Sequence, residues 1–330
     1  RPAAGNHCSV LNMTASDDNS VAIRAITRAD LPAVAQLLND IFRHQHGVFD
    51  QDVVTDFPLV FIEPNFGNCR VIEVDGQIVS HSAIFPCEQV VNNRRYKTAL
   101  IILVATLEEH RRRGYADQIM RDLQDTMIDE GYQLGILWTR VAPFYEQLGW
   151  ETVVPKGWLI EDLLSHDLSG LRSSTGIAVR YSEGRHLDGV IGIHDGESVR
   201  ITRSRDEYAA LMQLPKVESW VLERDGAVAA YICLGQARNK HGIIESGGAA
   251  KDVAALTANV VSENEYAGPL KMMIYHTQSE LADLLRAADI PLVPIQCSKG
   301  PGTEMILVTP GTNFPAEDRE RLFVWGLDTT

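Results

Sequence analysis

The chain has little of what marks several protein classes. Only 5 of its 330 residues are cysteines, and no two stand in a Cys-x-x-Cys pair, so the spacing predicts neither a structural zinc site nor a disulfide framework. The longest uninterrupted apolar run, residues 99–105, is far shorter than the ~20 residues of a membrane helix. Lys and Arg number 30 against 44 Asp and Glu, a net charge of −14, which disfavours a nucleic-acid-binding surface.

The remaining composition is that of an ordinary globular protein. Hydrophobic residues make up 45% of the chain and charged residues 22%, which predicts a folded core. At ~150 residues per domain, the length predicts two domains. The scattered cysteines favour a cytoplasmic location. We expect no metal, nucleic-acid or membrane partner, and the oligomeric state stays open, a homo-oligomer included.

Residues 1–20 are predicted to lie outside the fold. They are rich in Ala, Asn, Ser and Asp and contain no apolar stretch of the kind found in a secretory signal. Met13 is a candidate for the natural start of translation. We therefore expect this segment to be a disordered tail or a vector-derived extension.

From residue 21 the pattern becomes regular and alternates between strands and helices. Asp75-Gly76 lies between two alternating apolar runs, which is a strong hairpin signal. Asp30 is a candidate N-cap for a helix that follows it, with Pro32 in the first turn. The further predicted elements are strands at 21–26, 100–104, 134–138 and 150–154 and helices at 114–130 and 142–148.

The second half of the chain repeats this order. Two of its segments resemble segments of the first half at offsets of 156 and 150 residues: 177–180 resembles 21–24, and 220–229, with its own Asp-Gly turn, resembles 70–79. The agreement of the two offsets predicts a duplicated domain. We expect one domain at 21–165 and a second at 166–330, with the boundary in the polar stretch 165–176.

The most informative segment lies between the strand 100–104 and the helix 114–130. A loop at a helix N-terminus presents free backbone N–H groups, and the helix dipole adds positive potential, so a phosphate fits there. Gly114 lets the backbone approach phosphate oxygens closely. Three arginines, Arg111 to Arg113, add charge. No Gly-Lys-Ser/Thr or Gly-x-Gly pair is present, so the loop is neither a P-loop nor a dinucleotide fingerprint.

This segment resembles a known family. The pattern Arg111-x-x-Gly114-x-Ala116 resembles the Arg/Gln-x-x-Gly-x-Gly/Ala loop of the GCN5-related N-acetyltransferases (GNAT). About 30 residues further on, 142–150 resembles the Phe-Tyr-x-x-x-Gly-Phe segment of that family. The resemblance covers residues 21–154. The two-repeat layout further resembles the Eis-type acetyltransferases, although this chain is too short for their third, sterol-carrier-like domain.

The resemblance implies a fold and a site. The fold is of the mixed α/β (α+β) class: two tandem GNAT-like domains, each a mostly antiparallel sheet with flanking helices and one parallel, splayed strand pair. It implies acetyl-CoA as cosubstrate. The backbone of Val104, Ala105 and Thr106 would bond its pantetheine arm, and the amides of Arg111, Arg112, Arg113, Gly114, Tyr115 and Ala116 would hold its pyrophosphate.

Two further roles follow from the resemblance. Tyr145 would be the general acid that protonates the leaving thiolate, and a phenol with pKa near 10 is suited to that task. The strand 100–106 contains no carboxylate, so the general base stays open between water, a carboxylate from elsewhere and the terminal carboxylate of Thr330, which is the Eis-type arrangement. The second repeat has no basic loop at 245–252, so we interpret it as non-catalytic.

The sequence therefore predicts an acetyl-CoA-dependent N-acetyltransferase in which an amine attacks the thioester directly in a ternary complex. The acidic net charge and the resemblance favour a small cationic amine as acceptor. A protein or peptide amine is the alternative within the same chemistry. The alternative outside catalysis is an acyl-CoA-binding regulatory protein without turnover.

Overall fold

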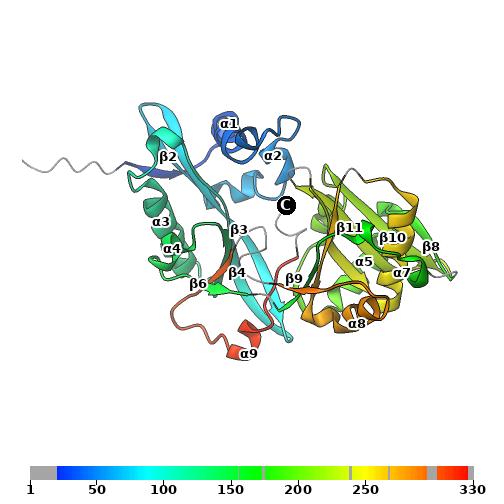
Figure 1. Ribbon diagram of the computed structural model, residues 1–330. Helices are drawn as coiled ribbons and strands as arrows, with labels where there is room; N and C mark the ends of the chain where they lie inside the picture. The colour runs from blue at the N-terminus through cyan, green and yellow to red at the C-terminus, as the bar shows by residue number, and fades with distance from the viewer. Residues whose placement is uncertain are drawn as a thin grey trace, which may run out of the picture.

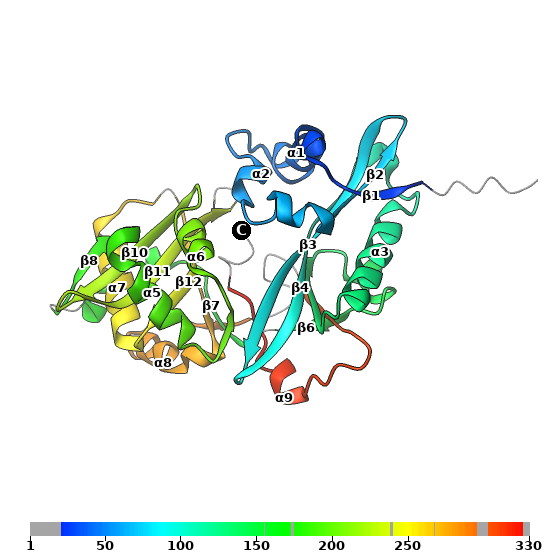
Figure 2. The same cartoon turned by 180° about the vertical axis from the view of Figure 1, so that it is seen from behind.

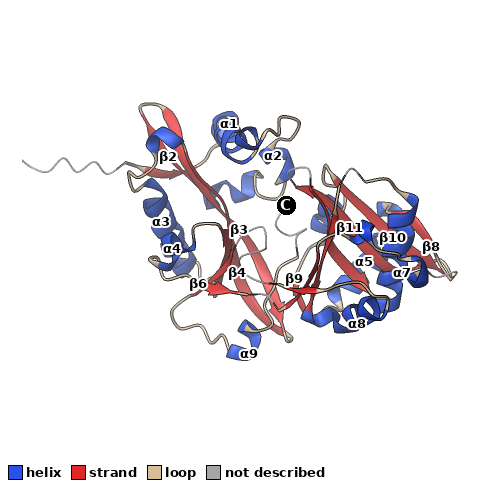
Figure 3. Ribbon diagram, in the orientation of Figure 1, coloured by secondary structure: helices blue, strands red, loops and turns tan. Residues whose placement is uncertain are grey.

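The computed structural model describes residues 21–154, 156–172, 175–237, 240–266, 268–295 and 303–325. Two mixed sheets stand beside each other, each with helices packed on it (Figures 1 and 2). Most of the first sheet comes from the first half of the chain, and most of the second sheet comes from the second half (Figure 1). Figure 3 shows the strands of both sheets in red, with the helices on them in blue. This is the mixed α/β class expected from the sequence.

The first sheet has the strand order β1-β2-β3-β4-β5-β15-β6, and β9 pairs with the far end of β3. Only β4 and β5 run parallel; the other neighbours are antiparallel. The strands are β1 (Ile23–Ala25), β2 (Cys69–Val74), β3 (Gln77–Val91), β4 (Arg94–Thr106), β5 (Leu134–Thr139), β6 (Glu151–Val153), β9 (Val199–Ile201) and β15 (Thr303–Val308).

The second sheet follows the same plan, with the order β8-β10-β11-β12-β13-β7-β14. Its parallel pair is β12 with β13. Its strands are β7 (Gly157–Ile160), β8 (Ile177–Arg180), β10 (Val217–Arg224), β11 (Ala227–Ala237), β12 (Lys240–Gly248), β13 (Leu270–Tyr275) and β14 (Val293–Pro294). Position by position, β8, β10, β11, β12 and β13 therefore correspond to β1, β2, β3, β4 and β5 of the first sheet.

The two sheets exchange a strand. β7 belongs to the first half but lies between β13 and β14 of the second sheet. β15 comes from the end of the chain but lies between β5 and β6 of the first sheet. Each occupies the same place in its host sheet, so each sheet is completed by the other half of the chain. The domain boundary near residue 165 stays a prediction.

Helices cover the sheets in matching positions. In the first sheet α3 and α4 pack on one face, whereas α1, α2 and the second half of the chain lie on the other (Figure 1). The helices are α1 (Leu31–Phe42), α2 (Val53–Asp56), α3 (Tyr115–Asp129), α4 (Ala142–Glu146), α5 (Glu183–Asp195), α6 (Arg205–Leu211), α7 (Ala250–Glu263), α8 (Ser279–Ala287) and α9 (Ala316–Arg319). Among the described residues, none of them is long and apolar enough to cross a bilayer.

Local sequence signals explain several elements. Asp75 and Gly76 both have positive φ in the β2–β3 turn, and Asp225 and Gly226 repeat this in the β10–β11 turn, as an Asp-Gly hairpin requires. Asp30 stands at the N-cap position of α1 but its carboxylate does not cap that helix. It instead accepts hydrogen bonds from Arg24 and from the amide of Thr27, because the guanidinium of Arg24 lies within 2.8 Å of it.

The face of the first sheet that meets the second half forms one apolar cluster. Leu322 to Trp325 of the last described segment are all buried in it, against Tyr275 of β13 and Leu100 of β4. Tyr275 and Phe323 stack with ring centroids 3.9 Å apart. The sequence analysis named the terminal carboxylate of Thr330 as one candidate for the general base. Residues 322–325 are not a strand, and Thr330 lies outside the described residues.

Candidate active site

The parallel strands β4 and β5 separate part-way along their length. They pair at three positions, from Thr98 opposite Leu134 to Leu100 opposite Ile136. Beyond Leu100, β4 continues for six residues to Thr106, and no strand of the described chain pairs with these residues on the β5 side. The resulting gap exposes the edge of residues 104–106, where the sequence analysis places the pantetheine contacts.

A bulge in β4 marks the start of this gap. The β3–β4 register shifts between His81 and Ala83, and Leu103 adopts φ +54°, a conformation that is uncommon outside glycine. The ring of His81 lies beneath it, where Nδ1 donates to the carbonyl oxygen of Leu103 at 3.0 Å. Burial lowers the pKa of His81 to about 4. The ring is therefore neutral, with its proton on Nδ1, and it holds the bulge in place.

The loop from β4 to α3 forms a concave row of amides. Arg112 and Gly114 have φ +63° and +82° on either side of Arg113. Alternating backbone handedness of this kind turns successive N–H groups to one side and makes an anion-binding concavity. Within the described residues the amides of 112–117 donate no hydrogen bond, and the first helical bond of α3 is from Gln118 to Gly114 at 3.0 Å.

The loop has room and charge for a pyrophosphate. A Cβ atom added at Gly114 would meet nothing closer than Gln118 Nε2 at 3.7 Å. The side chains of Arg111, Arg112 and Arg113 are exposed, and Arg111 Nε donates to the carbonyl oxygen of Thr106 at 3.2 Å. The amides, the helix N-terminus and the arginines therefore fit a doubly charged anion. The assignment of these residues to a cofactor stays a prediction.

Tyr145 lies on α4 on the α3 side of the gap. Its phenol is buried next to Thr139, the last residue of β5, and its ring makes an edge contact with Trp150. Gln124 of α3 donates to the carbonyl oxygen of Leu148 at 2.9 Å, which fixes the turn after α4. Burial raises the pKa of Tyr145 to about 12, against a smaller lowering by the hydrogen bond with Thr139. The phenol therefore keeps its proton at neutral pH.

The first part of the chain matches a known domain family. Residues 22–153 match the profile of the acetyltransferase (GNAT) domain. This part of the chain is a GNAT acetyltransferase domain. No curated protein is detectably similar in sequence. In the described residues, no three His, Cys, Asp or Glu side chains come together as metal ligands.

Solved structures share the fold over most of the chain. A GCN5-related N-acetyltransferase from Kribbella flavida has 16% identity and a TM-score of 0.63, covering 87% of this chain and 71% of its own. A probable N-acyltransferase from Enterococcus faecalis has 16% identity and a TM-score of 0.65, covering 87% and 72%. Eis1 from Mycobacterium abscessus has 12% identity and a TM-score of 0.58, covering 87% and 73%.

The second sheet keeps the GNAT strand order but fills the corresponding gap. β12 and β13 also separate after three pairs, yet Gln278 reaches in from the segment after β13. Its Nε2 donates to Ser246 Oγ at 3.0 Å and to the Ser246 carbonyl oxygen at 3.4 Å. Ser246 corresponds to Val104 of the GNAT domain. A protein amide therefore occupies the position that the resemblance assigns to pantetheine in the first sheet.

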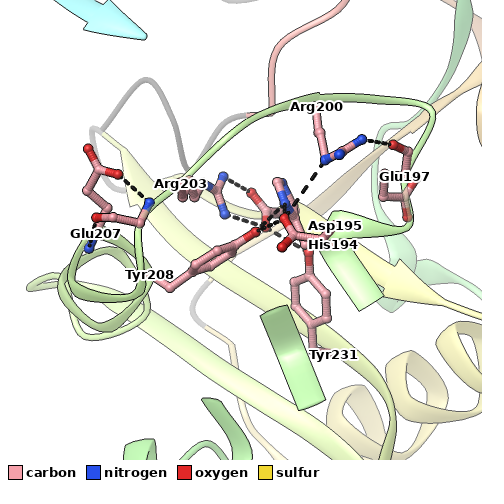
Figure 4. A network of polar contacts seen from close by, with 10 residues as sticks. His194, Asp195, Glu197, Arg200, Arg203, Glu207, Tyr208 and Tyr231 are labelled. Carbon is pink, nitrogen blue, oxygen red and sulfur yellow. Dashed lines mark hydrogen bonds and ion pairs between the residues drawn. The ribbon is translucent and has the colours of Figure 1, made fainter. Parts of the chain in front are cut away.

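The bulge position in β12 is also occupied. Glu245 corresponds to Leu103, and both its oxygens accept from Arg203, at 2.6 and 3.0 Å, while Tyr231 donates to it at 2.8 Å. Beside this pair, the hydroxyl of Tyr208 contacts His194 Nδ1 at 2.7 Å (Figure 4). Because these buried charges already pair with each other, a ligand would gain little by binding to them.

Sequence reasoning missed the residues that distinguish the two gaps. Gln278 and Arg203 carry no motif, and their partners lie 32 and 42 residues away. Sequence reasoning also missed Glu304, a buried carboxyl on β15, because the strand 303–308 was not predicted. A signal for that strand was present in the apolar run 305–308, but no sequence pattern assigns it to the first sheet.

Proposed function

We propose that the protein is an acetyl-CoA-dependent N-acetyltransferase that transfers the acetyl group to a small cationic amine by direct attack in a ternary complex. The observation that carries the proposal is the row of unpartnered amides at 112–117, which lies at the end of the same strand gap that Tyr145 flanks. The activated acetyl group is the chemistry that acetyl-CoA supplies.

The chain's own groups have separate tasks in this proposal. The amides of the loop and the arginines Arg111 to Arg113 hold the pyrophosphate, and the free edge of 104–106 bonds the pantetheine arm. Tyr145 donates its phenol proton to the leaving sulfur. Burial raises the pKa of Tyr145 to about 12, and the same apolar surroundings raise the basicity of a thiolate formed beside it, so the two groups stay matched.

A small acceptor fits the first sheet better than a protein does. The face opposite α3 is covered by the second half of the chain and by residues 322–325, which pack onto Leu100 and Ile136. A segment of a folded protein or a long peptide needs a broad groove across such a face. The net charge of −14 favours an acceptor that carries positive charge.

The first experiment measures thermal stabilisation by acetyl-CoA in the wild type and in Gly114→Asp. The substitution adds a negative charge inside the row of amides, where a Cβ atom meets no close neighbour. Gly226→Asp is the matched control, because Gly226 has φ +78° and open space but lies in the β10–β11 turn. At a hundredfold excess over Kd, binding should stabilise the wild type by ~2.7 kcal/mol.

We expect the stabilisation in the wild type and in Gly226→Asp, and its loss in Gly114→Asp. Release of free thiol on addition of a diamine then tests transfer itself. A wild type that is not stabilised by millimolar acetyl-CoA would remove the basis of the proposal. Stabilisation without thiol release from any amine would favour the regulatory alternative.

A further inference from the structure

The gap between β4 and β5 has two faces with different chemistry. The last paired residues are Leu100 and Ile136. On the face of α3 and α4, the end of β5 brings Thr139 next to Tyr145. On the opposite face the first unpaired side chains are Ile102 of β4 and Trp138 of β5, which follow Leu100 and Ile136 at a spacing of two. Leu100 and Ile136 are buried on this face, whereas Ile102 and Trp138 are only half-buried, so an acceptor that approaches a thioester held in the gap from this side meets these two side chains.

The side chain beside Trp138 on this face is a carboxyl. β15 pairs with β5 so that Glu304 lies opposite Trp138, and directly opposed residues point to the same face. The indole Nε1 of Trp138 donates to Glu304 Oε2 at 3.3 Å. Glu304 Oε1 is buried and has no hydrogen-bond partner in the described chain, and the residue as a whole is only 6% exposed.

Glu304 is exceptional among the buried carboxylates. The described chain buries three others, and each is paired with an arginine: Glu245 with Arg203, Asp252 with Arg224 and Asp318 with Arg94. No described cation pairs with Glu304. Burying a carboxyl without a cation or a full set of hydrogen bonds is unfavourable. A cationic partner would therefore offset the cost of burying this carboxyl.

The surroundings control when this carboxyl is charged. Burial raises the pKa of Glu304 to about 8, against a smaller lowering by the hydrogen bond from Trp138. A negative charge on Tyr275 of β13 would repel an ionised Glu304. Burial, however, raises the pKa of the Tyr275 phenol well above its ordinary value. At neutral pH Tyr275 is therefore uncharged, and the positive charge of an arriving ammonium group lowers the pKa of Glu304, so that the carboxyl can ionise and accept a proton.

We propose that Glu304 binds the ammonium group of the acceptor and removes its first proton, so that the second half of the chain supplies the general base of the GNAT domain. This inference rests on the proposed function. It fills the role that the strand 100–106 leaves empty, because that strand has no carboxylate. Glu304 and Tyr145 then act from opposite faces of the end of β5.

The proton balance of the step closes. The alkylammonium gives one proton to Glu304 and becomes a neutral amine, whose nitrogen forms the C–N bond as the C–S bond breaks. Tyr145 gives its proton to the sulfur. The second proton lost by the nitrogen, passed through water, restores the phenol. Glu304 releases its proton to solvent, so an ammonium and a thioester yield an amide, a thiol and one proton.

The test compares two acceptors in the wild type and in Glu304→Gln. 1,4-Diaminobutane is protonated at pH 7.5 and needs a base, whereas 4-methoxyaniline is already neutral there. We expect Glu304→Gln to lower kcat/KM for the diamine at least 100-fold and for the aniline less than threefold. The stabilisation by acetyl-CoA should be unchanged. Glu304→Asp should restore part of the activity with the diamine.

Glu151→Gln on the neighbouring strand β6 is the control, because Glu151 is exposed and its partner is Arg319. Equal loss with both acceptors would show a packing defect, and no loss with either would show that Glu304 is not the base; each overturns the inference. A wild type inactive on both amines contradicts the proposed function instead. In that case a binding measurement still tests whether Glu304 binds an ammonium group. At pH 9, 1,4-diaminobutane should raise Tm of the wild type but not of Glu304→Gln. Butane-1,4-diol, which has no charge, should raise Tm of neither protein.

Discussion

The junction between strand and helix differs between two sheets that otherwise share one plan. In the first sheet, eight residues separate the end of β4 from the start of α3, and among the described residues the amides of 112–117 donate no hydrogen bond. In the second sheet only Ala249 separates β12 from α7. There the first turn of the helix contains Asp252, a buried carboxylate that Arg224 holds at 2.5 Å, so a protein anion already occupies the positive end of the helix dipole.

The glycines at the two junctions show the same difference. A Cβ atom at Gly114 would make only an ordinary contact, with Gln118 Nε2 at 3.7 Å, whereas one at Gly248 would lie 2.6 Å from the carbonyl oxygen of Ala229. Gly248 lets two strands approach, and Gly114 leaves space for something outside the chain. Two sheets with the same fold therefore need not share a binding site. The length of the strand–helix junction and side chains such as Gln278 decide whether a ligand can enter the gap between the parallel strands.

The largest effect is expected from separating the two sheets. A fragment of residues 21–165 lacks β15, so the edges of β5 and β6 lose their partner and the apolar residues around Leu100 and Ile136 become exposed. We expect no cooperative unfolding transition by circular dichroism and no stabilisation by acetyl-CoA. Adding the fragment 166–330 should restore both. A fragment 21–165 that unfolds cooperatively and binds acetyl-CoA would show that the exchanged strand is dispensable.

The next effect tests the acid on the α3 side of the gap. Tyr145→Phe removes the proton donor and keeps the ring, so kcat should fall roughly 10²–10³-fold while acetyl-CoA still stabilises the protein. Tyr132→Phe is the matched control, because Tyr132 is also buried with its pKa raised to about 12 by burial, but it lies before β5, away from the gap. Equal kcat values for both variants would remove Tyr145 from the mechanism.

The two junction glycines predict unequal costs for the same substitution. Gly248→Ala forces a Cβ atom against backbone and should lower the free energy of unfolding by ~3 kcal/mol. Gly114→Ala meets no neighbour and should cost ~1 kcal/mol from its positive φ alone. Urea unfolding of both variants measures the difference. Equal costs would mean that the second junction is not tightly packed.

The smallest effect separates two buried glutamates by pH. Glu304 keeps its proton up to about pH 8 when folded, whereas the unfolded chain loses it near 4.5. Stability therefore falls as pH rises from 4.5 to 8, because the folded state holds the extra proton. Glu304→Gln should remove this loss, so its gain in stability over the wild type should be small at pH 5 and should grow as the pH rises to 8.

Glu245 should behave in the opposite way. Burial alone would raise its pKa, but Arg203 and the hydrogen bond from Tyr231 outweigh burial and lower it. Glu245→Gln leaves Arg203 buried without a countercharge, so it should destabilise the protein at pH 5 as well as at pH 8. Thermal unfolding over pH 5–9 distinguishes the two variants. Parallel pH curves for both would mean that the two carboxyls share one environment.

The predictable parts of the fold are those set by neighbours in sequence. Turn chemistry and hydrophobic periodicity act over a few residues, so short patterns predict three features. These are the Asp75-Gly76 turn, the strand-loop-helix segment around Gly114 and the resemblance between the two halves of the chain. Gly114 was recognised for the same reason: positive φ and a helix start can be inferred from adjacent residues.

The parts that could not be predicted depend on distant contacts. Glu304 and its partner Trp138 are 166 residues apart, and an apolar strand can pair with either sheet without changing its pattern. The alternation of side chains gives the buried face but not the partner strand. The same holds for Gln278, whose amide fills the second gap only because β12 and β13 separate beside it.

The exchanged strand also fixes an order of events during synthesis. β5 and β6 leave the ribosome long before β15, yet β15 must lie between them. Until residue 308 has been made, β5 and β6 have no strand between them while the second half of the chain is being synthesised. Their unpaired edges can then pair with the wrong strand. The catalytic half is therefore finished last, and only a nearly full-length polypeptide can complete the sheet on which the proposed chemistry depends.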